Sequence, residues 1–508
     1  MHRNLPLGSG IRSPVYNRTK HRGRGTPVMS DHRIEFQLDE IADADGHRVV
    51  GPVSLRWEAP GDACVLIGET GSGKSLVAQS ILGLLPPDFQ AKGSVWIKGN
   101  RIALENEAAL RAQWSTTMAL VPQEPFRALD PTMRIRRQLM QVKGSDDRRI
   151  DAALNELDLS PSVGKAYPFQ LSGGMAQRTL FATALISDAS LVVADEPTKG
   201  LDEARAAQSL AALRRLRAEG RSVLVITHDL HLARQLDGTT VVMKAGEVVE
   251  AAPAQELFAN PRNAYSRDLF QADPSNWSNG IARAKAPSKT VAELRDVSFG
   301  YRVEAPLFEN LSFTIDAGQV VAVTGPSGIG KTTLGDVLLG LHRATSGAVL
   351  WEGIDIAATR GTVPRLRRKY QKLHQDPASV FARHRTIGQH FVDLADVIGG
   401  AKLKERLDQL LERMKLSARL MERSVNEISG GEAQRLALMR ILMLDPLLIV
   451  ADEPSSRVDP IVQRDVFELL GSLRDQQNVA IVLISHQPRV VSSFADKVVP
   501  LDTSGERA

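Results

Sequence analysis

One glycine-rich segment occurs twice in this chain and constrains its fold more than any other feature. Residues 68–75 read Gly-Glu-Thr-Gly-Ser-Gly-Lys-Ser, and residues 325–332 read Gly-Pro-Ser-Gly-Ile-Gly-Lys-Thr. Both match G-x-x-x-x-G-K-[ST], in which the backbone N–H groups of a glycine-rich turn and the start of a helix hold phosphate. The two copies begin 257 residues apart. The sequence therefore predicts two copies of one phosphate-binding domain.

Three further motifs repeat at nearly the same distance. Ser172-Gly173-Gly174 recurs as Ser429-Gly430-Gly431, and Asp195-Glu196 recurs as Asp452-Glu453, both 257 residues later. His228 recurs as His486, one residue further on. Two sites in register over most of the chain indicate a pair of nucleotide-binding halves.

The pattern of apolar runs predicts an α/β fold in each half. Buried strands are expected to feed the two phosphate-binding loops, and helices are expected to start at Lys74 and Lys331. Helical periodicity at 148–157 and 403–414 predicts an inserted helical subdomain in each half. The expected strands are 64–67, 191–194 and 222–227 in the first half and 320–324, 447–451 and 480–485 in the second. Each half should thus be a mainly parallel sheet flanked by helices.

A length of 508 residues suits two large domains. We expect a basic tail at 1–30, a first domain at 31–270, an Ala/Ser/Pro-rich linker at 271–290 and a second domain at 291–508. No apolar run reaches the ~18–20 residues that span a bilayer. The one cysteine, Cys64, lies in an apolar run, which predicts a buried thiol and excludes an intramolecular disulfide or a cysteine metal cluster. This cysteine usage suits a reducing compartment.

The net charge of +4 comes from the first 30 residues, which hold six Lys and Arg and no acidic residue. The remaining chain carries a net charge of −2, which argues against nucleic-acid binding. Three interpretations of the basic segment stay open. It is a disordered tail, an arm for targeting or anionic lipid, or an artefact of a true start at Met29.

The repeated motifs predict the chemistry of a nucleotide site with Mg²⁺. Lys74 and Lys331 should reach the β- and γ-phosphates, and the hydroxyls of Ser75 and Thr332 should hold Mg²⁺. Asp195 and Asp452, each at the end of an apolar strand, should complete the Mg²⁺ shell. The adjacent Glu196 and Glu453 should polarise the attacking water. Phosphate binding is assigned to Gly68, Gly71, Ser72, Gly73 and Lys74 with Ser75, and to Gly325, Gly328, Gly330 and Lys331 with Thr332.

Together these motifs resemble those of ABC-transporter ATPases, here with two ATPase domains fused in one chain. Leu171–Arg178 and Ile428–Arg435 resemble the family's signature sequence. The resemblance implies that Ser172, Gly173 and Gly174 close over the ATP held by Lys331, and Ser429, Gly430 and Gly431 over the ATP held by Lys74. It also implies an antiparallel β subdomain in each P-loop NTPase domain.

The same resemblance assigns roles to single residues outside these motifs. Gln123 and Gln375 match the loop that senses Mg²⁺ and the membrane partner, and His228 and His486 match the switch histidine at the γ-phosphate. Asp202 and Asp459 match the loop that crosses between domains, and Tyr301 matches an aromatic residue that stacks on adenine.

Branch-level motifs resemble those of peptide/nickel importers. They are Tyr167–Gln170 before the first signature, Val121–Pro125 and His374–Pro377 around the two glutamines, and Asn260–Ser266 after the first domain. The resemblance implies an ATP-hydrolysing subunit that powers import of peptides or a related small solute, such as a nickel complex. Two membrane-spanning permease subunits and an extracytoplasmic binding protein would be its partners. It would lie peripherally on the cytoplasmic face of the bacterial inner membrane.

Some positions depart from the family pattern. Residues 38–56 contain no aromatic residue, so adenine of the first site would rest on aliphatic side chains or His47. The fifth signature positions are Met175 and Glu432, and the second half lacks the tail that follows the first. Because Glu196, Glu453 and both histidines are present, we expect two hydrolytic sites.

Two other functions compete with peptide import. One is a soluble twin ATPase that acts on ribosomes or DNA, which the short linker and single cysteine disfavour. The other is the fused ATPase of a sugar importer, which the intact Ser-Gly-Gly motifs and Tyr167-Pro168 disfavour.

Overall fold

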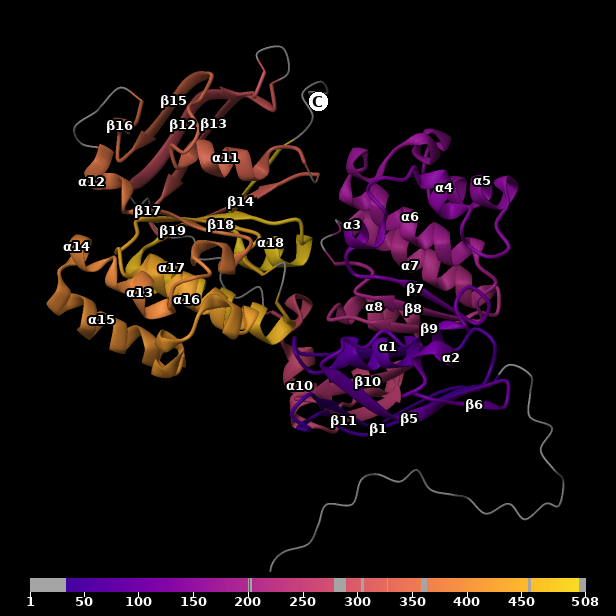
Figure 1. The fold of residues 1–508 in the computed structure, drawn as a ribbon. Coiled ribbons are helices and arrows are strands. Elements are labelled where there is room, and N and C mark those ends of the chain that lie inside the picture. The colour runs from indigo at the N-terminus through magenta and orange to yellow at the C-terminus, as the bar shows by residue number, and fades with distance from the viewer. Residues whose placement is uncertain are drawn as a thin grey trace, which may run out of the picture.

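The computed structural model places two similar halves side by side (Figure 1). It describes residues 33–199, 201, 203–277, 289–302, 306–326, 328–357, 363–455 and 458–501. The predicted tail at 1–30, Asp202 and most of the predicted linker, residues 278–288, lie outside these ranges.

The first half contains a mainly parallel six-stranded sheet with the order β11-β10-β4-β9-β8-β7. Only β11 runs antiparallel, to β10. Its strands are β4 (Ala63–Gly68), β7 (Met118–Val121), β8 (Leu191–Asp195), β9 (Ser222–Ile226), β10 (Thr239–Lys244) and β11 (Glu247–Pro253). β4, β8 and β9 match the predicted strands. All six residues of β4 are buried, as expected for a parallel strand covered on both faces.

A separate antiparallel sheet covers one side of the first half, as the family resemblance implied. It contains β1 (Ile34–Asp43), β2 (Arg48–Val50), β3 (Val53–Trp57), β5 (Phe89–Ile97) and β6 (Asn100–Ala103). Apolar residues that point to one face of the parallel sheet, such as Leu66 and Val193, pack against this sheet and α1 (Lys74–Leu82). Their neighbours Val65 and Val192 point to the other face and join a second core. The alternation follows from the two-residue period of a strand.

The second core of the first half is built from helices. It joins the parallel sheet to α6 (Gly173–Ile186), α7 (Glu203–Ala218), α8 (Leu230–Leu236) and the short helices inserted before the first signature. The inserted helices are α3 (Pro125–Ala128), α4 (Ile135–Leu139) and α5 (Asp147–Glu156), and α5 matches the predicted helix. α2 (Glu107–Arg111) packs near α1, and α9 (Ala254–Ala259) and α10 (Ala264–Gln271) follow the last strand.

The second half repeats this plan. Its parallel sheet has the order β17-β18-β19-β14-β20, with β14 (Val320–Thr324), β17 (Tyr370–Leu373), β18 (Leu448–Asp452), β19 (Ala480–Ile484) and β20 (Lys497–Pro500). Its antiparallel sheet contains β12 (Thr290–Phe299), β13 (Phe308–Asp316), β15 (Ser346–Trp351) and β16 (Ile354–Asp355). The helices are α11 (Lys331–Leu338), α12 (Val363–Arg367), α13 (Ile387–Val392), α14 (Ala395–Ile398), α15 (Gly400–Arg413), α16 (Gly430–Leu442), α17 (Pro460–Gln477) and α18 (Pro488–Phe494). The predicted strands and the helical segment 403–414 are therefore confirmed.

The two halves meet at α10, which Figure 1 shows beside the second half. Asp268 of α10 pairs with Arg464 of α17 at 2.7 Å. Trp277, at the described end of the linker, packs on Phe467 of α17 with ring centroids 5.2 Å apart. After α10 the chain forms a 3-10 turn, η3 (Pro274–Asn276). The Pro274 carbonyl oxygen of this turn accepts a hydrogen bond from Ser493 of the second half.

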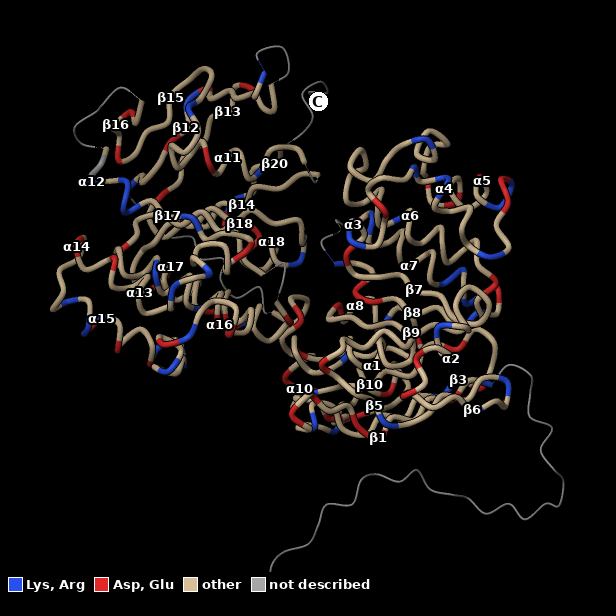
Figure 2. Tube along the Cα trace, viewed as in Figure 1, with Lys and Arg blue, Asp and Glu red and all other residues tan. Residues whose placement is uncertain are grey.

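Charged residues of both signs are interspersed along both halves (Figure 2). None of the helices in the described ranges has the length and apolar composition that crossing a bilayer requires.

Candidate functional site

The first phosphate loop, residues 68–75, is a tight turn between β4 and α1. Gly71 and Gly73 have φ of 84° and 93°, which only glycine adopts without strain. A Cβ at Gly68 would lie 2.0 Å from the carbonyl oxygen of Met243, so side-chain bulk is excluded there. Burial lowers the pKa of Lys74, whose ammonium donates to the carbonyl oxygens of Gly68 at 2.9 Å and Glu69 at 2.7 Å. The loop therefore concentrates N–H groups and one buried cation at the end of a strand.

The second phosphate loop, residues 325–332, lies between β14 and α11 in the same way. Gly328 and Gly330 have φ of 86° and 106°. Lys331 donates to the carbonyl oxygens of Gly325 at 2.8 Å and Pro326 at 2.9 Å. Both predicted helix starts, at Lys74 and Lys331, are confirmed.

In both halves the loop hydroxyl lies beside the aspartate that ends the strand next to the edge of the parallel sheet, β8 or β18. Ser75 Oγ is 3.4 Å from Asp195 Oδ1, and Thr332 Oγ1 is 3.2 Å from Asp452 Oδ1. Burial, helped by the charge of Glu196, raises the pKa of Asp195 to about 6. A buried carboxylate beside a hydroxyl is a pair of hard oxygen donors of the kind Mg²⁺ prefers.

Each glutamate that follows is held against the predicted histidine. His228 Nδ1 is 2.8 Å from Glu196 Oε2, and His486 Nδ1 is 2.9 Å from Glu453 Oε1. Burial opposes ionisation of both glutamates, but the paired histidine and the loop lysine outweigh it, so each glutamate has a lowered pKa. These carboxylates are ionised acceptors at neutral pH, which suits contact with a water molecule.

The backbone at both glutamates is strained. Glu196 and Glu453 have φ of 49° and 46°, a region that residues other than glycine rarely adopt. Their N–H groups donate to the carbonyl oxygens of Ile226 at 2.8 Å and Ile484 at 2.9 Å. Strain of this kind costs about 1–3 kcal/mol and is concentrated at functional sites.

The predicted glutamines lie beyond the neighbouring strand, at the edge of each site. Gln375 donates to Glu453 Oε2 at 3.0 Å. Gln123 is half-buried and follows β7 by two residues.

Each signature motif starts a helix with an exposed serine and glycine. Ser172 Oγ accepts a hydrogen bond from Met175 N–H and caps α6, and Ser429 Oγ accepts from Glu432 N–H and caps α16. The Ser429 hydroxyl also donates to the Glu432 carboxylate at 2.8 Å, whereas Met175 contacts the apolar core. Because Met175 and Glu432 differ at the fifth signature position, the Ser429 cap has a side-chain hydrogen bond that, among the described residues, the Ser172 cap lacks.

The loop that crosses between the halves is visible on one side. Thr70 N–H, in the first phosphate loop, donates to Asp459 Oδ2 of the second half at 3.4 Å. Asp459 also caps α17, since its Oδ1 accepts from Ile461 and Val462 N–H.

The aromatic residue assigned to adenine is exposed and close to the second phosphate loop. Tyr301 is 68 % exposed, packs edge-on against Phe299, and places its hydroxyl 3.4 Å from Thr333 Oγ1. In the first half, the suggested His47 is exposed and lies 3.5 Å from Asp43. Contact of either residue with adenine stays a prediction.

Two residues that contact the sites, Tyr265 and Lys372, were not assigned to them in the sequence analysis. Tyr265 of α10 accepts a hydrogen bond from Glu69 N–H at 2.9 Å, so the tail after the first domain contacts the first phosphate loop. Lys372 of β17 lies 3.4 Å from Asp452. Because Gln371 is its neighbour in the same short strand and Lys369 precedes that strand, the local pattern does not single out Lys372.

Comparison with known proteins agrees with this geometry. The ABC transporter family model matches residues 52–199 and 308–456. The chain therefore belongs to the ABC transporter family, as a protein with two ATPase domains, and ATP binding and hydrolysis are its chemistry.

Among curated proteins, the chain is 32% identical to the peptidoglycan transport ATP-binding protein YejF of Agrobacterium fabrum, covering 94% of this chain and 88% of that protein. It is 29% identical to the glutathione import ATP-binding protein GsiA of Salmonella choleraesuis, covering 88% and 80%.

Among solved structures, it resembles the archaeal ribosome recycling factor aABCE1 in its complex with the ribosomal stalk protein aP1. The TM-score is 0.64 at 22% identity, covering 91% of this chain and 87% of that one, which shows the shared fold alone.

Proposed function

We propose that this chain is the ATP-hydrolysing subunit that powers import of peptides or a related small solute through separate membrane permease subunits. The observation that carries the proposal is the contact between Thr70 and Asp459, which joins one phosphate loop to the opposite half. A nucleotide held at this loop would be sensed by both halves. The relatives named for transport of peptidoglycan and glutathione support a peptide-like solute.

ATP binding would close the halves on each other. Lys74 and Lys331 would leave the loop carbonyls to bind phosphate oxygens, and the exposed N-terminus of α16 would cap the nucleotide of the first site. The start of α6 would cap that of the second. N–H groups at a helix start stabilise anions. A nucleotide that contacts both halves would add a link to the contacts that α10 and Thr70 already make with the second half.

Mg²⁺ would be held by Ser75 and Asp195 in the first site and by Thr332 and Asp452 in the second, with Gln123 and Gln375 nearby. When bound, it would neutralise charge on the β- and γ-phosphates. Glu196 and Glu453, ionised and oriented by His228 and His486, would position water for attack on the γ-phosphate. Hydrolysis would remove the group that joins the halves and let them separate.

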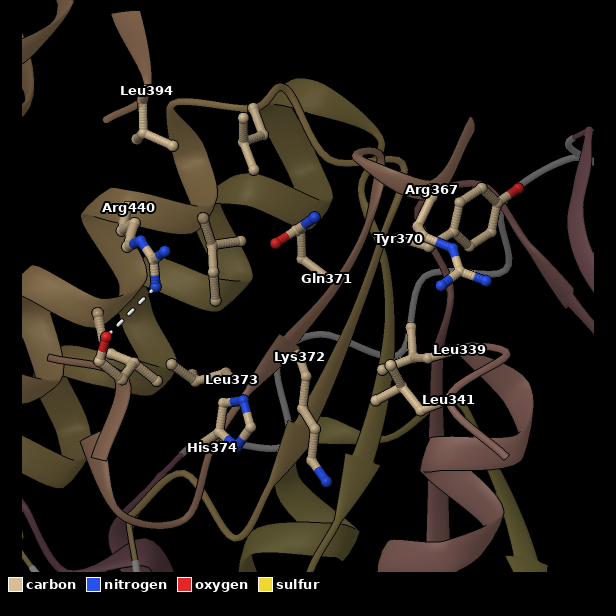
Figure 3. A pocket seen from close by; sticks show the side chains of 14 residues that line it. Leu339, Leu341, Arg367, Tyr370, Gln371, Lys372, Leu373, His374, Leu394 and Arg440 are labelled. Atoms are coloured by element: carbon tan, nitrogen blue, oxygen red, sulfur yellow. Dashed lines mark hydrogen bonds between the residues drawn. The ribbon is translucent and has the colours of Figure 1, made fainter. Parts of the chain in front are cut away.

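A groove in the second half supports a membrane partner. It has a volume of about 310 Å³ and lies between β17 and the helical subdomain (Figure 3). Leu341, 57 % exposed, gives it an apolar wall, and Arg367 and Arg440 add positive charge. We propose that a permease helix with apolar and acidic side chains docks here, on the strand that leads to Gln375. With a permease docked here, the chain would lie peripherally on the cytoplasmic face of the inner membrane.

Uptake and co-purification test the proposal together. Cells carrying the wild-type chain should accumulate a radiolabelled oligopeptide, and cells with Glu196→Gln and Glu453→Gln together should not. The tagged chain should co-purify with integral membrane proteins in detergent. Uptake that does not depend on these two residues, with the chain sedimenting on ribosomes, would contradict the proposal.

A further inference from the structure

The two nucleotide sites carry different side chains at one equivalent position of β7 and β17. The register of each strand on its neighbour shows that the two positions are equivalent. Leu120 of β7 lies opposite Val193 of β8, and Lys372 of β17 lies opposite Val450 of β18. Each strand precedes the glutamine of its half. The first half thus carries an apolar side chain where the second carries a cation.

A second exchange accompanies the first. Asp336 lies five residues after Lys331, and the residue five after Lys74 is Gln79. Lys372 Nζ is 2.7 Å from Asp336 Oδ1, with exposed side-chain fractions of 11% and 17%. The second half therefore replaces Leu and Gln with a largely buried ion pair.

This ion pair lies against the predicted Mg²⁺ ligand. Lys372 Nζ is 3.4 Å from Asp452 Oδ2, while Oδ1 of the same carboxylate faces the Thr332 hydroxyl at 3.2 Å. Figure 3 shows the Lys372 side chain leaving β17 in the direction opposite to Gln371. One carboxylate oxygen thus faces the phosphate loop and the other faces a fixed ammonium.

We propose that the Lys372–Asp336 pair sets the divalent-cation affinity of the second site and makes it weaker than that of the first. The proposal rests on the proposed assignment of Asp452 as a Mg²⁺ ligand. A buried ammonium beside this carboxylate takes up part of its negative charge and repels a second cation. Asp336 offsets part of that repulsion, so the effect is a graded weakening.

The first site has no matching ammonium at this strand position, because Leu120 occupies it. Against the effect of burial, the charges of Lys74 and Lys199 also lower the pKa of Asp195. In the described part of the chain, neither lysine lies within 4 Å of its carboxylate oxygens. Among charged groups, Lys372 acts most strongly on Asp452. The difference between the sites is therefore localised to two exchangeable side chains.

The test measures Mn²⁺ binding by electron paramagnetic resonance in the full chain with a non-hydrolysable ATP analogue. Lys74→Ala restricts the readout to the second site, and Lys331→Ala restricts it to the first. In the second site, Lys372→Leu with Asp336→Gln should tighten Mn²⁺ binding by about three- to tenfold, as expected for a partly compensated buried charge. Asp336→Asn, which leaves Lys372 to Asp452 alone, should weaken it.

The reciprocal exchange, made in the first half, still tests the proposal if the substitutions in the second half prevent folding. Leu120→Lys with Gln79→Asp should weaken Mn²⁺ binding at the first site by a similar factor. Unchanged affinities in both exchanges, or tighter binding in Asp336→Asn, would overturn the proposal. Since the readout needs no permease or solute, it is independent of whether the chain powers import.

Discussion

The backbone N–H of Thr70 donates to Asp459 Oδ2 at 3.4 Å across 389 residues of sequence. Thr70 belongs to the first phosphate loop, and Asp459 caps α17 of the second half. Because one carboxylate bonds both the loop and the helix, a change at the nucleotide can reach the opposite half through one side chain.

Asp459→Asn should separate these two functions. An asparagine Oδ1 can still cap α17, but its amide nitrogen is a donor and would face the Thr70 N–H. We expect the melting temperature to change little and ATP hydrolysis by a Lys331→Ala chain to fall several-fold. Unchanged hydrolysis in a folded variant would exclude a role for this contact.

Tyr265→Phe should weaken ATP binding at the first site. Loss of the hydroxyl leaves Glu69 N–H without its 2.9 Å acceptor, a cost of about 0.5–1.5 kcal/mol or roughly two- to twelvefold in affinity. Binding of a fluorescent ATP analogue to the Lys331→Ala chain measures this. Tyr370→Phe is the matched control, because the Tyr370 hydroxyl donates to Val291 far from the first site. Equal effects of the two variants would refute a specific role.

Asp195→Asn should stabilise the chain in the absence of divalent cation. Burial raises the pKa of Asp195 from 3.8 to about 6, so the folded state binds this proton more tightly than the unfolded state. Ionisation then costs stability as pH rises from about 4 to 6, and the cost is full above 6. Asparagine avoids it.

Thermal unfolding in EDTA measures this effect. The melting temperature of Asp195→Asn should exceed that of the wild type at pH 7.5, and the gain should vanish near pH 4. At Asp452 burial also raises the pKa, but Lys372 opposes the rise, so Asp452→Asn should gain less. A melting-temperature gain that grows as pH falls would contradict a raised pKa of Asp195.

Glu196→Gln and Glu453→Gln should each lower ATP hydrolysis, and the double variant should lose it. An amide cannot act as the ionised acceptor for water. Steady-state phosphate release compares the three chains. A wild-type rate in either single variant would show that one site performs all the hydrolysis.

Much of the fold can be predicted from the sequence because apolar runs and turn glycines, which define its strands and loops, are local features of the chain. Runs such as Leu191–Ala194 are apolar throughout, which a strand covered on two faces requires, and the glycines of both loops mark their turns. The location of Glu196 and His228 at the same edge of the sheet also follows, since parallel strands bring their carboxyl ends to one edge.

Contacts that depend on side-chain packing between distant segments could not be predicted in this way. Tyr265 reaches Glu69 only because α10 folds back onto the phosphate loop. Lys372 reaches Asp452 only because β17 lies beside β18. Neither contact follows from spacing, since 196 residues separate the first pair.

The most direct test of the account asks which signature motif caps which nucleotide. A Cβ added at Gly173 or Gly430 meets no atom within 4 Å, so alanine at either position should leave the free chain intact but obstruct a phosphate at that helix start. Binding of a non-hydrolysable ATP analogue is measured in the Lys331→Ala chain, where only the first site remains. We predict that Gly430→Ala weakens binding and Gly173→Ala does not, with the reverse in the Lys74→Ala chain. Weakening by the signature of the same half would contradict the account.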